Sequence, residues 1–198
     1  MNDTLNYYNA HADQFISGTV SVDMGDIYNR FLKYVRPHSK ILDLGCGSGR
    51  DSKYFLDQGH LVQPIDGSEI ICQNARKFLN TNVLCMTFDE LNFKNEFDAV
   101  WACASLLHVE KKNMKNVLQH VSLALKSEGI LYVSYKYGHE ERIADGRYFS
   151  DYTEKDIPLI FTPDVGLNCT EWWISTDVRA DRDQKWLNII CRKNHCLT

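Results

Sequence analysis

The chain has 198 residues, of which 44% are hydrophobic and 24% are charged, and its formal net charge is −4. This length suits a single domain, and this composition is typical of a folded globular protein rather than a disordered or fibrous chain. No apolar run approaches the ~20 residues that cross a bilayer, so we expect no membrane association. The 22 lysines and arginines form no run longer than two, which disfavours a protein held on duplex DNA by phosphate contacts.

Strands and helices alternate along the first two thirds of the chain. The first helix shows the pattern clearly, because Ile27, Phe31 and Val35 lie four residues apart. Ser48 and Ser68 precede two later helices, and we predict that both are N-caps. The predicted helices cover residues 26–35, 49–58, 68–79 and 111–126, and the predicted strands cover 41–44, 61–65, 83–85, 97–102 and 130–135. This alternation predicts βαβ units and a parallel sheet with helices on both faces.

The last third of the chain has a different character. Residues 138–151 are polar and contain two glycines, so we predict a long loop. Residues 153–157 are expected to open a short helix that Pro158 interrupts. Residues 170–176 and 185–191 read as two strands that form an antiparallel edge pair. The expected fold is therefore α/β, with a doubly wound, mostly parallel seven-stranded sheet that ends in an antiparallel C-terminal pair.

The cysteine content indicates a reducing compartment. The seven cysteines are an odd number, and they include no C-x-x-C pair. The amino terminus also lacks the basic-then-apolar pattern of a secretory leader, so we expect free thiols and a cytoplasmic protein. Near the carboxyl terminus, Cys191, His195 and Cys196 lack a second group of ligands at zinc spacing. We therefore predict no metal site.

The clearest functional signal is the glycine-rich segment 41–49, Ile-Leu-Asp-Leu-Gly-Cys-Gly-Ser-Gly. A strand that leads through glycines into a helix presents backbone amides to a ligand at the carboxyl edge of a sheet. Asp66 ends the next strand, where a carboxylate can accept both ribose hydroxyls of a nucleoside. The spacing differs from the G-x-G-x-x-G of dinucleotide sites, because Arg50 stands near the expected third glycine. Asp43 would repel a pyrophosphate, whereas it suits a ligand that carries a sulfonium and an ammonium.

These residues resemble the signature of the class I S-adenosylmethionine-dependent methyltransferases, hydrophobic-Asp-x-Gly-x-Gly-x-Gly, which is here 42–49. Asp66 matches the acid after the second strand of that family. Residues 97–108 are similar to its fourth strand and following loop, and residues 125–130 to the turn before its fifth strand. The resemblance extends over about residues 25–135, and the chain looks most like the small bacterial enzymes grouped with tellurite-resistance-type methyltransferases.

The resemblance implies a Rossmann-like fold and a single methyltransferase domain over residues 1–198. In this division, residues 1–37 form a helical cap over the cofactor, residues 38–136 form the cofactor-binding core, and residues 137–198 form the acceptor loop and the closing strands. The implied cofactor is S-adenosyl-L-methionine, with S-adenosyl-L-homocysteine as the product. The sequence leaves open whether the protein is a monomer or a homodimer.

The family's cofactor contacts can be carried over to this sequence residue by residue. The glycine loop lies against the methionine end and Asp66 holds the ribose, while Thr87 takes the place of an acid that contacts the adenine in many members. Alternative roles remain open: the glycines could form only a tight turn, Asp66 could cap the following helix, and Tyr8 could belong to the core. The implied cofactor-binding residues are Tyr8, Asp43, Gly45, Cys46, Gly47, Gly49, Arg50, Asp66, Gly67, Ser68, Thr87, Phe88, Ala102 and Cys103.

Methyl transfer from a sulfonium is an in-line displacement, so alignment and exclusion of water are the main tasks of the protein. A base is needed only where the accepting atom carries a proton. His108 is the candidate base, although it could equally be a structural histidine. Tyr135 and Arg147 are the other candidate catalytic residues. With Lys136 and Arg142 they could recognise an anionic or aromatic acceptor, unless this loop is simply solvated.

A small molecule of unknown identity is the expected acceptor. The Asn/Asp-Pro-Pro-Tyr/Phe motif of DNA amino-methyltransferases is absent, because residues 101–104 are Trp-Ala-Cys-Ala. Residues 147–149, Arg-Tyr-Phe, are similar to a segment of tRNA wobble-uridine carboxylate methyltransferases. A tRNA acceptor is therefore an alternative, disfavoured by the acidic net charge. A non-catalytic partner subunit that only binds the cofactor is the other alternative.

Overall fold

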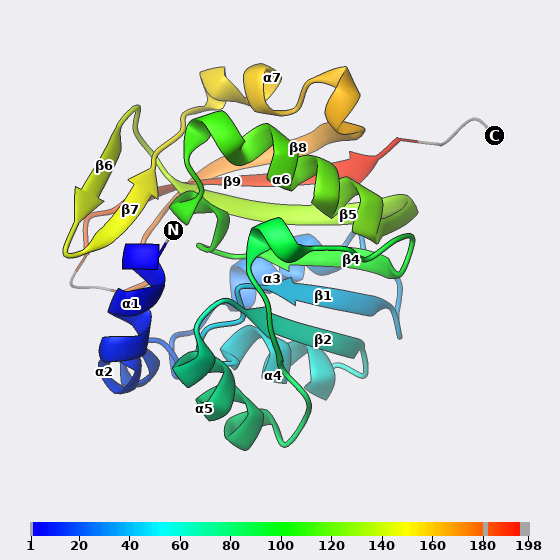
Figure 1. Ribbon diagram of the computed structural model, residues 1–198. Coiled ribbons are helices and arrows are strands. Elements are labelled where there is room, and N and C mark those ends of the chain that lie inside the picture. The colour runs from blue at the N-terminus through cyan, green and yellow to red at the C-terminus, as the bar shows by residue number, and fades with distance from the viewer. Residues whose placement is uncertain (1, 180–181, 195–198) are drawn as a thin grey trace.

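A computed structural model describes residues 2–179 and 182–194 and has a seven-stranded sheet at its centre (Figure 1). The order of its strands is β3-β2-β1-β4-β5-β9-β8. Strands β1 to β5 are parallel, whereas β9 runs antiparallel to both β5 and β8. These strands are β1 Lys40–Leu44, β2 Leu61–Asp66, β3 Leu84–Cys85, β4 Phe97–Ala102, β5 Leu125–Lys136, β8 Leu167–Thr176 and β9 Lys185–Lys193. The predicted fold class and the predicted C-terminal edge pair are confirmed.

Helices cover both faces of this sheet. Successive side chains of the central strand β1 point to opposite faces, and both sets include apolar residues, so each face needs a cover. Leu42 of β1 packs in a cluster that contains apolar residues of α6, whereas the preceding Ile41 packs with Phe31 of α3. The second cluster also contains Trp101 of β4 and Tyr132 of β5, whose rings stack at 4.1 Å between centroids. The helices are α1 Asn2–Ala10, α2 Ala12–Ser17, α3 Gly25–Leu32, α4 Arg50–Asp57, α5 Glu69–Leu79, α6 Lys111–Ala124 and α7 Ile157–Ile160.

The amino-terminal helices lie at the carboxyl ends of the parallel strands, beside a hairpin of strands β6, Glu141–Ala144, and β7, Arg147–Ser150 (Figure 1). Two hydrogen bonds hold α1 in this place. The hydroxyl of Ser68 donates to the side-chain oxygen of Asn9 at 2.6 Å, and the backbone N–H of Tyr148 donates to the hydroxyl of Thr4 at 3.0 Å. Helix α1 thus lies across the end of the sheet and is hydrogen-bonded both to the start of α5 and to the hairpin.

The hairpin is a departure from the sequence prediction, which placed a loop over residues 138–151. Arg142 pairs with Phe149, and Asp145 and Gly146 form the two-residue turn between the strands. Both turn residues have left-handed backbone angles, with φ of 52° and 75°. Asp-Gly is a strong signal for such a turn. The sequence analysis missed this hairpin because each flanking strand has only four residues and half of these residues are polar. The alternation that marks a strand is therefore weak.

Two of the three local predictions about helix ends were wrong. Ser68 is the N-cap of α5, as predicted, and its hydroxyl accepts a hydrogen bond from the backbone N–H of Ile71 at 3.2 Å. Ser48 does not cap α4, because Gly49 occupies the cap position in a left-handed conformation. Pro158 lies in the first turn of α7 and does not interrupt it, since the missing N–H of a proline is unneeded there.

No helix among residues 2–179 and 182–194 is long and apolar enough to cross a membrane. The prediction that Cys191, His195 and Cys196 form no metal site is not tested, because His195 and Cys196 lie outside the described residues.

Candidate active site

A cavity of about 390 Å³ opens at the carboxyl ends of the parallel strands. Its size falls in the range of small-molecule sites, and its position at this edge of the sheet is where α/β proteins bind ligands. Most of the residues that we predicted for the site line this one cavity. They are Tyr8, Gly45, Cys46, Gly47, Arg50, Asp66, Gly67, Thr87, Phe88, Cys103, His108 and Arg147.

The glycine loop forms one wall of the cavity, and its backbone leaves no room for a side chain at Gly45 or Gly47. Gly45 has a φ of +84°, and a Cβ atom there would lie 2.5 Å from the Cβ of Ser105. Gly47 has a φ of +52°, and its Cβ would lie 3.1 Å from the ring of Phe15 in α2. Left-handed backbone angles and close neighbours both require glycine at these positions. The loop therefore presents bare backbone to a ligand.

Asp66 fixes this loop from the end of β2. Its Oδ2 accepts a hydrogen bond from the backbone N–H of Gly47 at 3.0 Å, and its Oδ1 accepts one from Ser68 at 2.9 Å. Burial raises the pKa of the carboxyl, and these backbone hydrogen bonds work in the opposite direction. Asp66 thus orders the start of α5 and also faces the cavity, so the two roles considered for it are compatible.

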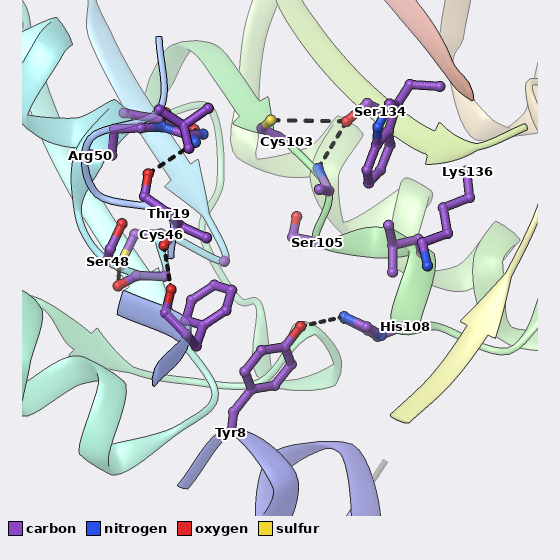
Figure 2. A pocket seen from close by; sticks show the side chains of 18 of the residues that line it. Tyr8, Thr19, Cys46, Ser48, Arg50, Cys103, Ser105, His108, Ser134 and Lys136 are labelled. Carbon is purple, nitrogen blue, oxygen red and sulfur yellow. Dashed lines mark hydrogen bonds and ion pairs between the residues drawn. The ribbon is translucent and has the colours of Figure 1, made fainter. Parts of the chain in front are cut away.

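Arg50 and its neighbour form a charged cluster beside the glycine loop. The Nε of Arg50 donates to Oδ1 of Asp51 at 2.6 Å, and Asp51 also accepts hydrogen bonds from Tyr28 at 2.5 Å and from Trp101 at 2.8 Å. Burial alone would raise the pKa of Asp51, but the Arg50 guanidinium and the hydrogen bonds from Tyr28 and Trp101 together lower it. Arg50, Ser48 and Cys46 lie together on one side of the cavity (Figure 2).

His108 lies on the other side and is hydrogen-bonded through both ring nitrogens. Its Nδ1 is 2.6 Å from the carbonyl oxygen of Tyr148, and its Nε2 is 2.9 Å from the hydroxyl of Tyr8 (Figure 2). Because a carbonyl only accepts, the proton is on Nδ1, and Nε2 accepts from Tyr8. Burial lowers the pKa of His108 to about 4. The ring is therefore neutral near pH 7, with its one lone pair directed at Tyr8.

The comparisons with known proteins bear directly on this cavity. A model of the methyltransferase-domain family matches residues 41–129, which include the glycine loop, Asp66 and His108. Residues 41–129 therefore carry a class I S-adenosylmethionine-dependent methyltransferase domain. A curated methyltransferase from Drosophila pseudoobscura pseudoobscura, an eEF1A lysine and N-terminal methyltransferase homolog, is 32% identical over 84 residues. That match covers 37% of this chain and 12% of the relative, so the chain spans about an eighth of that protein's length.

Solved structures resemble this methyltransferase over nearly its whole length. The 1,6-didemethyltoxoflavin-N1-methyltransferase of Burkholderia thailandensis, solved with its acceptor and S-adenosylhomocysteine, has a TM-score of 0.79 and 19% identity over 98% of this chain and 87% of its own. A TehB-like methyltransferase from Corynebacterium glutamicum has a TM-score of 0.71 and 16% identity over 93% of this chain and 99% of its own. At these identities the likeness concerns the fold, and it agrees with the resemblance to small bacterial methyltransferases.

Four of the predicted cofactor residues of the methyltransferase lie behind the cavity wall. Asp43 points towards α4 and accepts a hydrogen bond from Ser52 at 2.6 Å, and burial raises its pKa to about 8. Gly49 packs against side chains of α5, Ser68 is the cap described above, and Ala102 is fully buried in β4. In the structure they support the loop and the sheet, and their contacts with the cofactor stay predictions.

Tyr135 also lies outside the cavity, so its prediction as a catalytic residue is not supported by its position. Its side chain is fully buried, and its hydroxyl donates to the sulfur of Met114 in α6 at 3.3 Å. Successive residues of a strand point to opposite faces, and Ser134 and Lys136 line the cavity instead. The sequence reading placed the end of the strand at Tyr135 and therefore treated Lys136 as part of a loop.

The far side of the cavity contains Lys136, which the sequence analysis named for acceptor recognition, and other residues that it did not assign. Tyr132, Ser134 and Lys136 come from one face of β5, and Trp186 and Asn188 come from the same face of the adjacent β9. Because these side chains alternate with core residues, only the register of the two strands reveals them. The hydroxyl of Ser134 accepts a hydrogen bond from the backbone N–H of Ala104 at 2.8 Å, which joins this side to the loop after β4.

Proposed function

We propose that this methyltransferase moves the methyl group of S-adenosylmethionine to a small-molecule acceptor. The observation that carries the proposal is the division of one cavity into two unlike halves. One half contains the glycine loop and Asp66, and the other contains His108, Lys136 and strand residues unrelated to the family signature. A cavity of this size accommodates a cofactor end and a compact acceptor better than it does a macromolecule.

The residues present suit the proposed cofactor. Asp66 offers carboxylate oxygens for the ribose hydroxyls, and the bare backbone at Gly45 and Gly47 allows the methionine end to approach. Arg50 offers a cation to the methionine carboxylate, and Thr87 and Phe88 lie by Gly67 where the adenine would fit. When bound, S-adenosylmethionine supplies an electrophilic methyl group on a sulfonium, and its displacement leaves a neutral thioether.

We propose that residues 1–37 act as a cap over the cofactor. Phe15 of α2 lies against Gly47, and Tyr8 of α1 reaches His108 across the cavity. The hydrogen bonds from Ser68 and Tyr148 hold α1 in that position. A cap of this kind would exclude water from the methyl group, which is one of the two main requirements of the reaction.

Tyr8 and His108 are suited to receive a proton from the acceptor. The acceptor would donate its proton to the Tyr8 oxygen as Tyr8 passes its own proton to Nε2 of His108. The neighbouring Arg147 favours the ionised form of Tyr8, although burial keeps the pKa of Tyr8 above its usual value. A weakly basic histidine suits a hydroxyl or ring nitrogen, because such an atom becomes strongly acidic as the methyl group arrives.

This proposal predicts a specific pattern of activity. With labelled S-adenosylmethionine and a panel of small hydroxyl- and nitrogen-bearing acceptors, His108→Gln is expected to lower kcat by about 10²- to 10⁴-fold while S-adenosylhomocysteine affinity stays the same. Tyr8→Phe is also expected to lower kcat. Transfer to unmodified tRNA alone would favour the RNA alternative, and no transfer to any acceptor despite cofactor binding would favour the partner-subunit alternative.

The protonation of His108 depends on pH and can be tested without an acceptor. Because the pKa of folded His108 is about 4 rather than 6.5, Nε2 keeps its lone pair at neutral pH and loses it only as the pH falls to about 4. Imidazole ¹⁵N NMR, assigned with His108→Gln, should therefore report a neutral ring protonated on Nδ1 at pH 6. Titration near pH 6.5 would contradict the buried hydrogen-bonded ring and the relay that depends on it.

A further inference from the structure

Two cations that line the acceptor side of the cavity lie beside one aromatic ring, and the Cζ of Arg142, which does not line the cavity, lies 5.3 Å from the centroid of the same ring. The Nζ of Lys136 lies 3.9 Å from the centroid of the Phe149 ring, and the Cζ of Arg147 lies 5.2 Å from it. Both cations line the cavity, and so does Phe149. Such contacts stabilise a cation only modestly, so the ring orients the two side chains without neutralising them.

Lys136 has no carboxylate partner among the described residues, and that of Arg147 is distant and exposed, whereas Arg50 is closely paired. Within the described part of the chain, no acidic side chain forms an ion pair with Lys136. Arg147 approaches only Asp145, at 3.7 Å, and that aspartate side chain is 80% exposed. The Nε of Arg147 is buried and has no hydrogen-bond partner. By contrast, Arg50 pairs with Asp51 in the buried cluster described above.

The charges of the neighbouring groups make this arrangement costly without an anion. Arg142 pairs with Asp151, which is the acidic group that favours the charged form of Lys136. Burial, Arg142, Arg147 and Arg182 all act in the opposite direction and lower the pKa of Lys136. A buried donor without an acceptor and a partly buried cation without a counterion both cost free energy. A bound anion would remove both costs.

The geometry points to a carboxylate-binding subsite formed by Lys136 and Arg147, so we infer that the methyl acceptor is a small carboxylic acid. This inference deepens the proposed function and rests on it. The Nε edge of an arginine can donate two parallel hydrogen bonds to a carboxylate, and the Nε of Arg147 is the donor that lacks a partner. Lys136 adds a second, less directional charge.

The subsite is distinct from the place proposed for the cofactor's own carboxylate. Arg50 lies beside the glycine loop, whereas Lys136 lies across the cavity on the side of His108 (Figure 2). Arg147 neighbours both Phe149 and Tyr8. A carboxylate held there would keep the rest of a small acceptor close to the Tyr8–His108 pair. The accepting atom would then be a second group of the same molecule, such as a hydroxyl or a ring nitrogen.

The test compares a carboxylate with its uncharged amide. Binding of benzoate and of benzamide to the full chain saturated with S-adenosylhomocysteine is measured by calorimetry, and inorganic phosphate is the third probe. Benzoate is expected to bind at least tenfold more tightly than benzamide and than phosphate. Lys136→Met and Arg147→Met should each weaken benzoate binding by roughly ten- to hundredfold. The exposed Lys33→Met, which removes the same charge far from the cavity, should leave it unchanged.

The outcomes separate this inference from the function on which it rests. If S-adenosylhomocysteine does not bind to the wild-type chain, the proposed function fails. If it binds and benzoate binds no better than benzamide, only the carboxylate subsite is overturned, and this comparison does not depend on how the variants fold. Tighter binding of phosphate would overturn the assignment to a carboxylate. Loss of S-adenosylhomocysteine affinity in Lys136→Met would place the cation at the cofactor and overturn the acceptor assignment.

Discussion

Gly45→Ala is expected to lower the free energy of unfolding by about 3 kcal/mol and to abolish binding of S-adenosylhomocysteine. The backbone of Gly45 has a φ of +84°, which costs an alanine about 1–2 kcal/mol. The new Cβ would also lie 2.5 Å from the Cβ of Ser105, so the loop or the segment after β4 must move. Chemical denaturation gives the change in stability, and calorimetry gives the change in affinity.

A double variant separates the two causes. Ser105→Gly removes the atom that the new Cβ would meet. Gly45→Ala combined with Ser105→Gly should therefore recover the stability lost to the steric clash, but not the stability lost to the left-handed backbone angle. Gly25→Ala is a suitable control, because Gly25 has an ordinary backbone angle and its Cβ would meet only the flexible side chain of Asp23, at 3.1 Å. Wild-type stability in Gly45→Ala would mean that the glycine loop does not have the conformation described.

Asp66→Asn is expected to weaken binding of S-adenosylhomocysteine by at least about a hundredfold. Both carboxylate oxygens accept hydrogen bonds from backbone N–H groups, of Gly47 and of Ser68. An asparagine must turn its NH₂ group towards one of these donors, which disturbs either the loop or the start of α5. It also removes an acceptor for the ribose hydroxyls, so two effects add in the same direction.

Calorimetric titration with S-adenosylhomocysteine measures this loss. Asp57→Asn is the matched control, because Asp57 is exposed, pairs only with Lys53 on α4 and does not line the cavity. The control should bind as the wild type does. Equal affinity in Asp66→Asn and in the wild type would remove Asp66 from the cofactor site and leave it only its role at the start of α5.

The sequence predicts the elements around the glycine loop well because their signals are local. Apolar periodicity defines the helices and strands, and the glycines of the loop follow a strand directly, so their place at the sheet edge needs no knowledge of tertiary structure. Local signals do not tell which way the side chains of Asp43 and Ala102 point, and both lie away from the cavity. Both belong to the correct strands, but the face to which each side chain points depends on the packing of the strand.

The acceptor half could not be predicted in the same way, because it is assembled from distant segments. Tyr8 and His108 are 100 positions apart, and no local pattern links them. The sequence left His108 undecided between a structural and a chemical role, and its contacts support both, since one nitrogen is held by a backbone carbonyl and the other by Tyr8. The sequence names Lys136 for acceptor recognition, but its position on β5 beside β9 comes only from the tertiary structure.

The central claim is that the glycine loop and Asp66 form a site for an adenosyl cofactor. Thermal unfolding of the wild-type chain with S-adenosylhomocysteine, and separately with the same concentration of NAD, tests it most directly. At about 100 times its Kd, a ligand that binds only the folded state adds about 2.7 kcal/mol, which for a domain of this size raises Tm by roughly 5–10 °C. We predict that shift with S-adenosylhomocysteine and none with NAD. An unchanged Tm with S-adenosylhomocysteine, or an equal shift with NAD, would contradict the account.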